Sequence, residues 1–206
     1  MSSWDLSLLH QINTAWSHPA LDWIMPAISA IEAWVPLIVT AVLLAAWRGG
    51  KRARVMLLCL GIAVGIGDGV ISNTLKKTIG RVRPRDALKT VTVRDLGPAS
   101  PAFMRLFEPV VIKPSEPNGE VRGKSFPSSH TVNMFAAATV IASFYRRAGL
   151  LMYVLAAAVA YSRVYCGAHW PSDIPPSMAL GVLVGLGIVA AAKRVTAASG
   201  SPFRRA

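Results

Sequence analysis

The stretch IPPSMALGVLVGLGIVAAA at residues 174–192 decides the fold class, because no charged residue interrupts it. A helix needs about 20 mostly apolar residues to cross the hydrocarbon core of a bilayer. Four more apolar runs approach this length, and the shorter ones reach it when their flanks are included. The predicted spans are residues 33–47, 55–72, 131–145, 150–165 and 174–192. The pattern predicts an all-α polytopic membrane bundle of about five to six transmembrane helices.

The composition agrees with a chain that sits in a membrane. Of its 206 residues, 53% are hydrophobic and only 16% are charged, whereas a soluble domain carries about 25% charged residues. Intrinsic disorder is excluded as well, since it requires low hydrophobicity. The length fits a single membrane-embedded domain over residues 1–206. Residues 1–32, which include Asp22 and Pro26, are expected to form an interfacial N-terminal segment.

The distribution of basic residues tests this topology independently. Three segments, which follow the first, third and fifth spans, contain none of the 10 acidic residues. Their basic residues are Arg48, Lys51, Arg52, Arg54, Arg146, Arg147, Lys193, Arg194, Arg204 and Arg205. Basic residues accumulate in short loops on the cytoplasmic side of a membrane. The net charge of +12 therefore reflects topology and not a nucleic-acid partner. It predicts a cell (inner or cytoplasmic) membrane protein whose other face is periplasmic or external.

The long connection at residues 76–127 lies on that external face. It is rich in proline and glycine and has little periodicity. Such a segment is expected to be an irregular extramembrane loop or lid. Its two ends carry two of the three polar clusters in the sequence.

The first cluster is KKTIGRVRP at residues 76–84. Pro84 disfavours a helical conformation at Arg83, and Gly80 weakens the last helical turn, so Lys76 is expected at the end of a helix and Arg83 on the loop beyond it. Two readings stay open from these residues alone. The cations either anchor the protein to lipid phosphates at the interface or bind the phosphate of a substrate.

The second cluster is FPSSH at residues 126–130, directly before the third span. Serine is a preferred helix cap, and the free N–H groups of a first helical turn bind anions. Ser128 and Ser129 therefore predict a helix start that could hold a phosphate, with His130 in its first turn. The alternative is a capped helix whose histidine simply lies at the interface.

The third cluster is SRVYCGAHWPSD at residues 162–173. Asp173 follows His169 by four residues, so its carboxylate can hold one imidazole nitrogen and leave the other free as a nucleophile or base. Arg163 offers a forked donor that suits phosphate. A salt bridge at a helix end would explain the same spacing. Because the topology places all three clusters on one side of the membrane, we favour phosphoryl transfer through a phosphohistidine.

These three motifs, with their order, spacing and position relative to the spans, resemble the signature of the type 2 phosphatidic acid phosphatase and vanadium haloperoxidase superfamily. The resemblance covers residues 30–192, although Ser129 stands where the family usually has glycine. It implies that His169 attacks phosphorus, that Asp173 orients its ring, and that His130 protonates the leaving oxygen. It further implies that Lys76, Arg83, Arg163, Ser128 and backbone N–H groups near Ser129 bind the phosphate oxygens. Neither a metal nor another cofactor is expected.

The membrane setting points to the lipid phosphatases of this family, with a substrate that arrives from the bilayer. The compact form is similar to bacterial undecaprenyl-diphosphate phosphatases, which makes undecaprenyl diphosphate the first candidate. Phosphatidylglycerol phosphate, phosphatidate and a lipid A phosphate are the alternatives, as is phosphotransfer to a second lipid. Asp68 lies within the second span and is expected to pair with a motif cation or with the Ser162 hydroxyl. The sequence does not indicate an oligomeric state.

Overall fold

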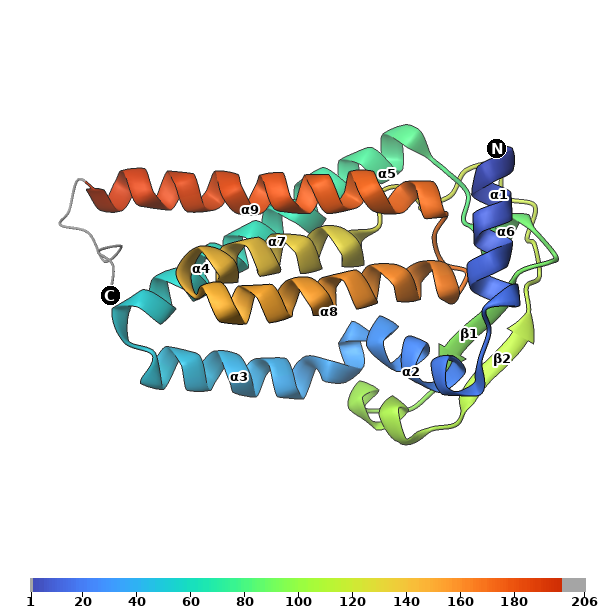
Figure 1. Ribbon diagram of the computed structural model, residues 1–206, viewed down its shortest axis with the longest axis horizontal. Helices are drawn as coiled ribbons and strands as arrows, with labels where there is room; N and C mark the ends of the chain where they lie inside the picture. Colours follow the sequence, from blue (N-terminus) through green and yellow to red (C-terminus); the bar gives the residue numbers. More distant parts are fainter. Residues whose placement is uncertain (1, 198–206) are drawn as a thin grey trace.

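Long helices formed by the apolar runs lie side by side and define the long axis of the molecule (Figure 1). The computed structural model describes residues 2–197. Four of its helical segments are long and apolar enough to cross a membrane: Ile31–Arg48, Gly50–Ala87, Arg146–Tyr165 and Pro171–Val195. The prediction of a helical, polytopic membrane protein is therefore confirmed.

Several of these segments change helix type along their length. The first joins the 3-10 turn η2 (Ile31–Trp34) to α3 (Val35–Arg48), and the second joins α4 (Gly50–Gly65), the π-helical η3 (Ile66–Ser72) and α5 (Asn73–Ile79). The third is α8 (Arg146–Tyr165), and the fourth is the 3-10 turn η5 (Pro171–Asp173) followed by α9 (Ile174–Ala197). Pro175 and Pro176 fall in the first turn of α9, where a missing N–H breaks no helical hydrogen bond.

The predicted span at residues 131–145 corresponds to α7 (Ser129–Phe144), which has 16 residues. At 1.5 Å per residue this is about 24 Å, which is shorter than the roughly 30 Å of a hydrocarbon core. Figure 1 shows α7 among α4, α8 and α9, and eight of its side chains are buried. A helix enclosed by its neighbours can be shorter than one that faces lipid. The fifth span therefore stays a prediction.

Glycines on both neighbours allow α7 to pack closely. A Cβ on Gly181 of α9 would lie 2.4 Å from the Val132 carbonyl oxygen, and one on Gly149 of α8 would lie 2.1 Å from the Cα atom of Ala142. Neither contact is possible for a residue with a side chain unless the helices move apart. Because α7 begins at the second motif and α8 ends at the third, this packing sets the distance between the two motifs.

The predicted basic segments gather at one end of the bundle. Figure 1 shows the α3–α4 turn, the α7–α8 turn and the end of α9 together there. The Arg52 guanidinium donates to the Phe144 carbonyl oxygen and links the first two of these turns. This arrangement confirms that the described basic residues share one end. Arg204 and Arg205 lie outside the described residues.

The prediction of an irregular connection at residues 76–127 is wrong for its central part. The short helix α6 (Pro84–Ala87) is followed by strands β1 (Thr92–Leu96) and β2 (Val110–Pro114), with the 3-10 turn η4 (Ala102–Phe107) between them. The strands pair antiparallel, from Thr92 opposite Pro114 to Leu96 opposite Val110. Each strand has only five residues, too few to show a clear alternation among the surrounding prolines and glycines.

The N-terminal segment packs on the end of the bundle opposite the basic turns (Figure 1). It consists of α1 (Ser3–His10), the π-helical turn η1 (Gln11–Ala15) and α2 (Pro19–Ser29). Leu9 and Ile12 join Val91, Tyr165 and Trp170 in one buried apolar cluster. Asn13 is 1% exposed and bonds to backbone groups of Thr92 and Tyr165. The segment therefore covers the chain near the third motif.

Candidate active site

The first motif is positioned by a helix that stops at a glycine. Gly80 has φ +62°, a left-handed conformation that ends α5 at low cost, and Arg83 is extended just before Pro84. Both features match the sequence prediction. Lys76 lies in the last turn of α5, and its Nζ atom donates to Ser129 Oγ at 2.5 Å. This bond joins the first motif to the second.

The second motif forms the predicted helix cap. Ser128 is fully buried, and its hydroxyl accepts from the Thr131 amide at 3.4 Å and from the Thr131 hydroxyl at 3.0 Å. The Ser128 amide in turn donates to Ser177 Oγ at 3.0 Å. The Ser128 side chain thus serves the start of α7, while Ser129 contacts Lys76. His130 follows in the first turn.

The third motif brings His169 and Asp173 together at the start of α9. Nδ1 of His169 lies 3.7 Å from Oδ2 of Asp173, which is an ion-pair distance and longer than a hydrogen bond. Both side chains are almost completely buried. Burial lowers the pKa of His169 to about 4, while Asp173 acts to raise it and the positive charge of Arg163 acts to lower it. At neutral pH His169 is therefore an uncharged imidazole.

Three of the predicted residues carry buried donors without a hydrogen-bond partner. In the described part of the chain, five buried side-chain polar atoms lack a partner, and three of them are Arg83 Nε, Arg163 Nε and His169 Nδ1. Buried polar groups are nearly always hydrogen-bonded in native proteins, because leaving them unpaired is costly. Nδ1 of His169 faces the Asp173 carboxylate, so the free donors are those of Arg83 and Arg163, and buried free donors on two cations are typical of a site that receives an anion.

His130 and Arg163 face a cavity of about 160 Å³ between α2 and α8. Ser29, Cys166 and Ala168 also line this cavity, and the Arg163 guanidinium donates to Ser29. The position of Ser29 shows that α2 closes the side of the site, a role that sequence analysis did not assign. We call this space the central cavity.

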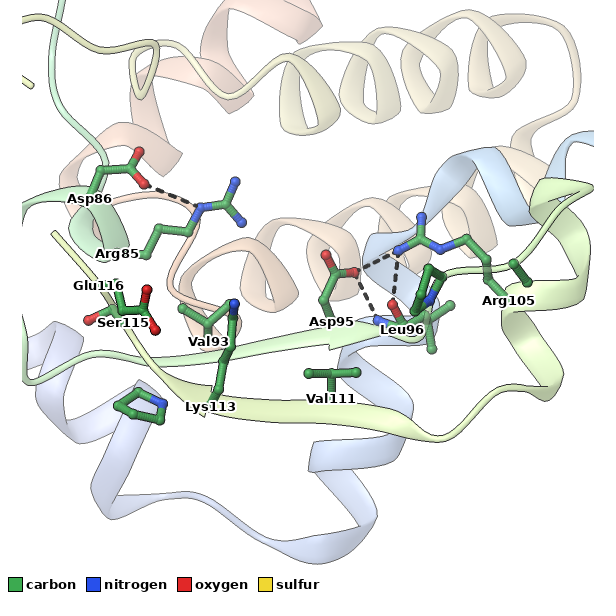
Figure 2. A pocket seen from close by; sticks show the side chains of 13 residues that line it. Arg85, Asp86, Val93, Asp95, Leu96, Arg105, Val111, Lys113, Ser115 and Glu116 are labelled. Carbon is green, nitrogen blue, oxygen red and sulfur yellow. Dashed lines mark hydrogen bonds and ion pairs between the residues drawn. The ribbon is translucent and has the colours of Figure 1, made fainter. Parts of the chain in front are cut away.

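Two further cavities adjoin the site. The first has about 750 Å³ and lies against the β1–β2 hairpin (Figure 2), where charged side chains of both signs line it; it shares Arg85 and Asp95 with the central cavity. We call it the hairpin cavity. The second has about 290 Å³ and is lined by Lys76 together with Lys77, Arg122 and Lys124. We call it the basic cavity.

The expectation for Asp68 is met only in part. Asp68 is exposed on η3, and the Ser162 hydroxyl donates to the Val159 carbonyl oxygen instead. Within residues 2–197 the Asp68 side chain forms no hydrogen bond or close ion pair, but its negative charge acts on the motif cation Lys76. Within residues 2–197 the structure shows no group of three or more His, Cys, Asp and Glu side chains placed to hold an ion.

Sequence analysis missed Arg81, Ser125 and Asp5. Arg81 lies within the first motif and donates to Asp173 at 2.5 Å, and Ser125 donates to the same carboxylate at 2.6 Å. Asp5 accepts from Arg81 at 2.6 Å. Arg81 could have been noticed from its place between Lys76 and Arg83. The sequence around Asp5 does not indicate a role for it, because only the fold brings this residue to the site.

The bundle and its anion-accepting, histidine-containing site define a membrane protein built for phosphoryl chemistry. The chain belongs to the PAP2 superfamily, whose family model matches residues 54–197. This range contains all eight predicted site residues. Membership makes the chain a membrane phosphatase in the class of phosphoric ester hydrolases.

The chain is similar to several known members. It is 25% identical to the lipid A 4'-phosphatase of Bacteroides thetaiotaomicron, over 88% of this chain and 73% of that protein. It is 40% identical to YbjG of Escherichia coli K12, which carries the provisional name undecaprenyl-diphosphatase, but over only 29% of this chain and 30% of that protein. The fold matches LpxE of Aquifex aeolicus with a TM-score of 0.64 and 20% identity, over 92% of this chain and 96% of that one.

Proposed function

We propose that the protein hydrolyses a lipid phosphomonoester or diphosphate through a phosphohistidine on His169. The observation that carries this is the group of buried, unpartnered donors around an uncharged imidazole. Nδ1 of His169 faces Asp173, which leaves Nε2 for attack. The Nε2 lone pair forms the bond to phosphorus as the bond from phosphorus to the leaving oxygen breaks. Burial and the nearby cation Arg163 lower the pKa of His130 to about 3 in the free protein; the negative charge of the bound phosphate favours its protonated form, and His130 then supplies the proton that the leaving oxygen takes up.

Water completes the cycle. It attacks the phosphorus of the phosphohistidine, His130 takes its proton, and the N–P bond breaks to release inorganic phosphate and neutral His169. Lys76, Arg83 and Arg163 hold the nonbridging oxygens and offset the charge that builds on them in the transition state. The Ser129 hydroxyl accepts a hydrogen bond from the Lys76 ammonium. Ser128 supports phosphate binding indirectly, because its side chain caps the start of α7.

We place undecaprenyl diphosphate first among the substrates. The basic cavity supports this choice, because it extends from Lys76 and offers Lys77, Arg122 and Lys124 to a second phosphate. The similarity to YbjG points the same way over a short segment. The external face of a cell membrane is the matching location, since the basic turns at the opposite end of the bundle favour the cytoplasmic side.

A lipid A phosphate is the second candidate, and the hairpin cavity favours it. This cavity is large, adjoins the central cavity and carries charges of both signs, as a bulky polar headgroup would require. A match over 88% of this chain is to a lipid A 4'-phosphatase. Phosphatidylglycerol phosphate, phosphatidate and transfer to a lipid acceptor use the same chemistry at His169.

The test measures phosphate release by detergent-purified protein in the presence of EDTA. Undecaprenyl diphosphate, lipid A, phosphatidylglycerol phosphate and phosphatidate are compared, each with and without a lipid acceptor. We expect release by the wild type and by His10→Gln, a control at the same end of the bundle, and none by His169→Gln. If the wild type and His169→Gln release equally little phosphate from every lipid, the proposal fails.

A further inference from the structure

A buried charge cluster behind His169 involves the N-terminal helix. Arg81 lies between two carboxylates, with NH1 2.5 Å from Oδ1 of Asp173 and NH2 2.6 Å from Oδ2 of Asp5. Asp5 is 1% exposed, and Asp173 is fully buried. We call Asp5, Arg81 and Asp173 the charge triad. Its members come from three separate parts of the chain, namely α1, the first motif and the third motif.

Asp5 has a complete set of donors that fix it in place. Its carboxylate accepts from the Ser172 amide at 3.0 Å and from the Ser172 hydroxyl at 2.7 Å, in addition to Arg81. Arg81 is held on another side by Trp170, whose ring centre lies 5.3 Å from the guanidinium carbon. Asp173 uses its remaining oxygen to accept from Ser125 and from the Trp170 amide. The arrangement is rigid and fully paired, and it leaves this oxygen beside His169.

The triad places net negative charge on the Asp173 side of His169. Arg81 and Asp173 alone would form a neutral pair, which could do little for a positive charge on the neighbouring imidazole. Asp5 adds a second negative charge, so the triad carries a net charge of −1. The other charged or titratable groups that face His169 are Arg163, Arg83 and His130. Because two of these are cations, the triad is the source of compensating negative charge.

We propose that Asp5 is a positioning residue for the reaction at His169. It fixes Arg81, which fixes the Asp173 carboxylate, and it supplies the net negative charge that balances the imidazole when the ring bonds to phosphorus and becomes cationic. The N-terminal helix is thereby part of the catalytic unit. This inference rests on the proposed function, since it assumes that His169 is the nucleophile.

The test uses variants that change the triad charge in opposite directions. Asp5→Asn makes the triad neutral. We expect kcat to fall about tenfold to a hundredfold and KM to change little, as is seen when a residue that orients a functional side chain is replaced. Losing negative charge also disfavours protonation of His169, so the acid limb of kcat/KM moves to lower pH. Arg81→Gln takes the triad to −2, which moves that limb to higher pH.

The double variant Asp5→Asn/Arg81→Gln distinguishes charge from packing. Its triad returns to −1, so we expect it to recover part of the rate lost in Asp5→Asn and to shift the acid limb back. A purely structural role predicts the reverse, with the double variant worse than either single one. Asn13→Ala is the matched control, because it removes buried hydrogen bonds of the same N-terminal segment without changing charge. We expect it to lower thermal stability and to leave the acid limb in place.

Each outcome bears on one claim only. If wild-type protein releases phosphate but Asp5→Asn keeps its kcat and pH profile, the inference is wrong and the proposed function stands. If Asp5→Asn does not fold, Arg81→Gln decides the matter, and an unshifted acid limb overturns the inference. A wild type that releases no phosphate from any lipid overturns the proposed function instead.

Discussion

The two ends of the helical bundle contain similar numbers of cations but use them differently. At the end formed by the α3–α4 and α7–α8 turns, the basic residues of these two turns have no acidic neighbours in the sequence, and the ion pairs found within residues 2–197 do not involve them. At the opposite end, acidic side chains pair with Arg81, Arg94 and Arg105. Arg83 and Arg163 have no ion pair there and keep buried free donors.

This difference separates two roles for a positive charge. Basic residues in short turns without acidic partners stay in water or at lipid headgroups. Their number, and not any single contact, sets the orientation of the protein in the membrane. The carboxylates at the other end pair with some cations, and Arg83 and Arg163 keep buried donors that we propose bind the substrate phosphate. The cations of an anion-binding site can therefore be recognised because they have no acidic partner, while most of the cations around them do.

The largest effect is expected from removing an unpaired cation of the site. Arg163→Gln should lower kcat/KM for a lipid phosphate by about 10²- to 10³-fold, because a donor to the charged transition state is lost. Arg163→Lys keeps the positive charge but loses the forked guanidinium donor. Its kcat/KM should therefore lie between those of the wild type and Arg163→Gln. Steady-state phosphate release with matched expression levels measures this. An unchanged kcat/KM in Arg163→Gln would remove this residue from the site.

A paired cation should matter for stability instead. Asp22→Asn removes the negative charge that pairs with Arg94, whose side chain is 4% exposed, and that accepts from the Tyr165 hydroxyl. We expect a loss of about 3 kcal/mol in the free energy of unfolding, the size seen when one partner of a buried pair is removed. Thermal unfolding in detergent measures the change. A melting temperature equal to that of the wild type would contradict the role of this pair.

A third effect follows from the depressed pKa of His169, which is about 4 in the folded protein. The unfolded chain binds a proton near pH 6.5 and the folded chain does not, so stability falls as the pH drops from about 6.5 towards 4. Between pH 7 and pH 5 this histidine should account for a loss of about 2 kcal/mol. His169→Gln should show a smaller loss over the same range, measured as melting temperature against pH. Parallel curves for the two proteins would argue against a buried neutral imidazole.

The smallest effect is expected at the basic end. Lys51→Gln and Arg147→Gln remove exposed charges that take part in none of the ion pairs formed among residues 2–197, so stability should change by less than about 0.5 kcal/mol. Phosphate release in detergent should also stay at the wild-type level. A loss of activity comparable to that of Arg163→Gln would show that the two ends are coupled.

Local signals in the sequence were sufficient for much of the fold and the site. The apolar runs predicted the long helices, Gly80 and Pro84 predicted where α5 ends, and Ser128 predicted where α7 begins. Each of these features depends on residues within one or two turns of the chain. The sequence therefore placed the three motifs on the correct elements.

Long-range contacts were outside the reach of such reasoning. Arg81 meets Asp5 across 76 residues and Asp173 across 92 residues, so neither pair has a spacing that a motif could show. The β1–β2 hairpin was missed because its short strands are joined by the η4 turn and not by a tight loop. The 3.7 Å separation of His169 and Asp173 likewise depends on Arg81 and Ser125 holding the carboxylate.

The most direct test of the central claim is to trap the phosphorylated enzyme. Protein is mixed with a lipid phosphate labelled with ³²P, quenched in denaturant within the first turnovers, and digested to locate the label. The account predicts label on His169 that survives alkali and is lost in acid, as expected for a phosphohistidine, and none in His169→Gln. Label on another residue, or turnover without labelled protein at any quench time, would contradict it.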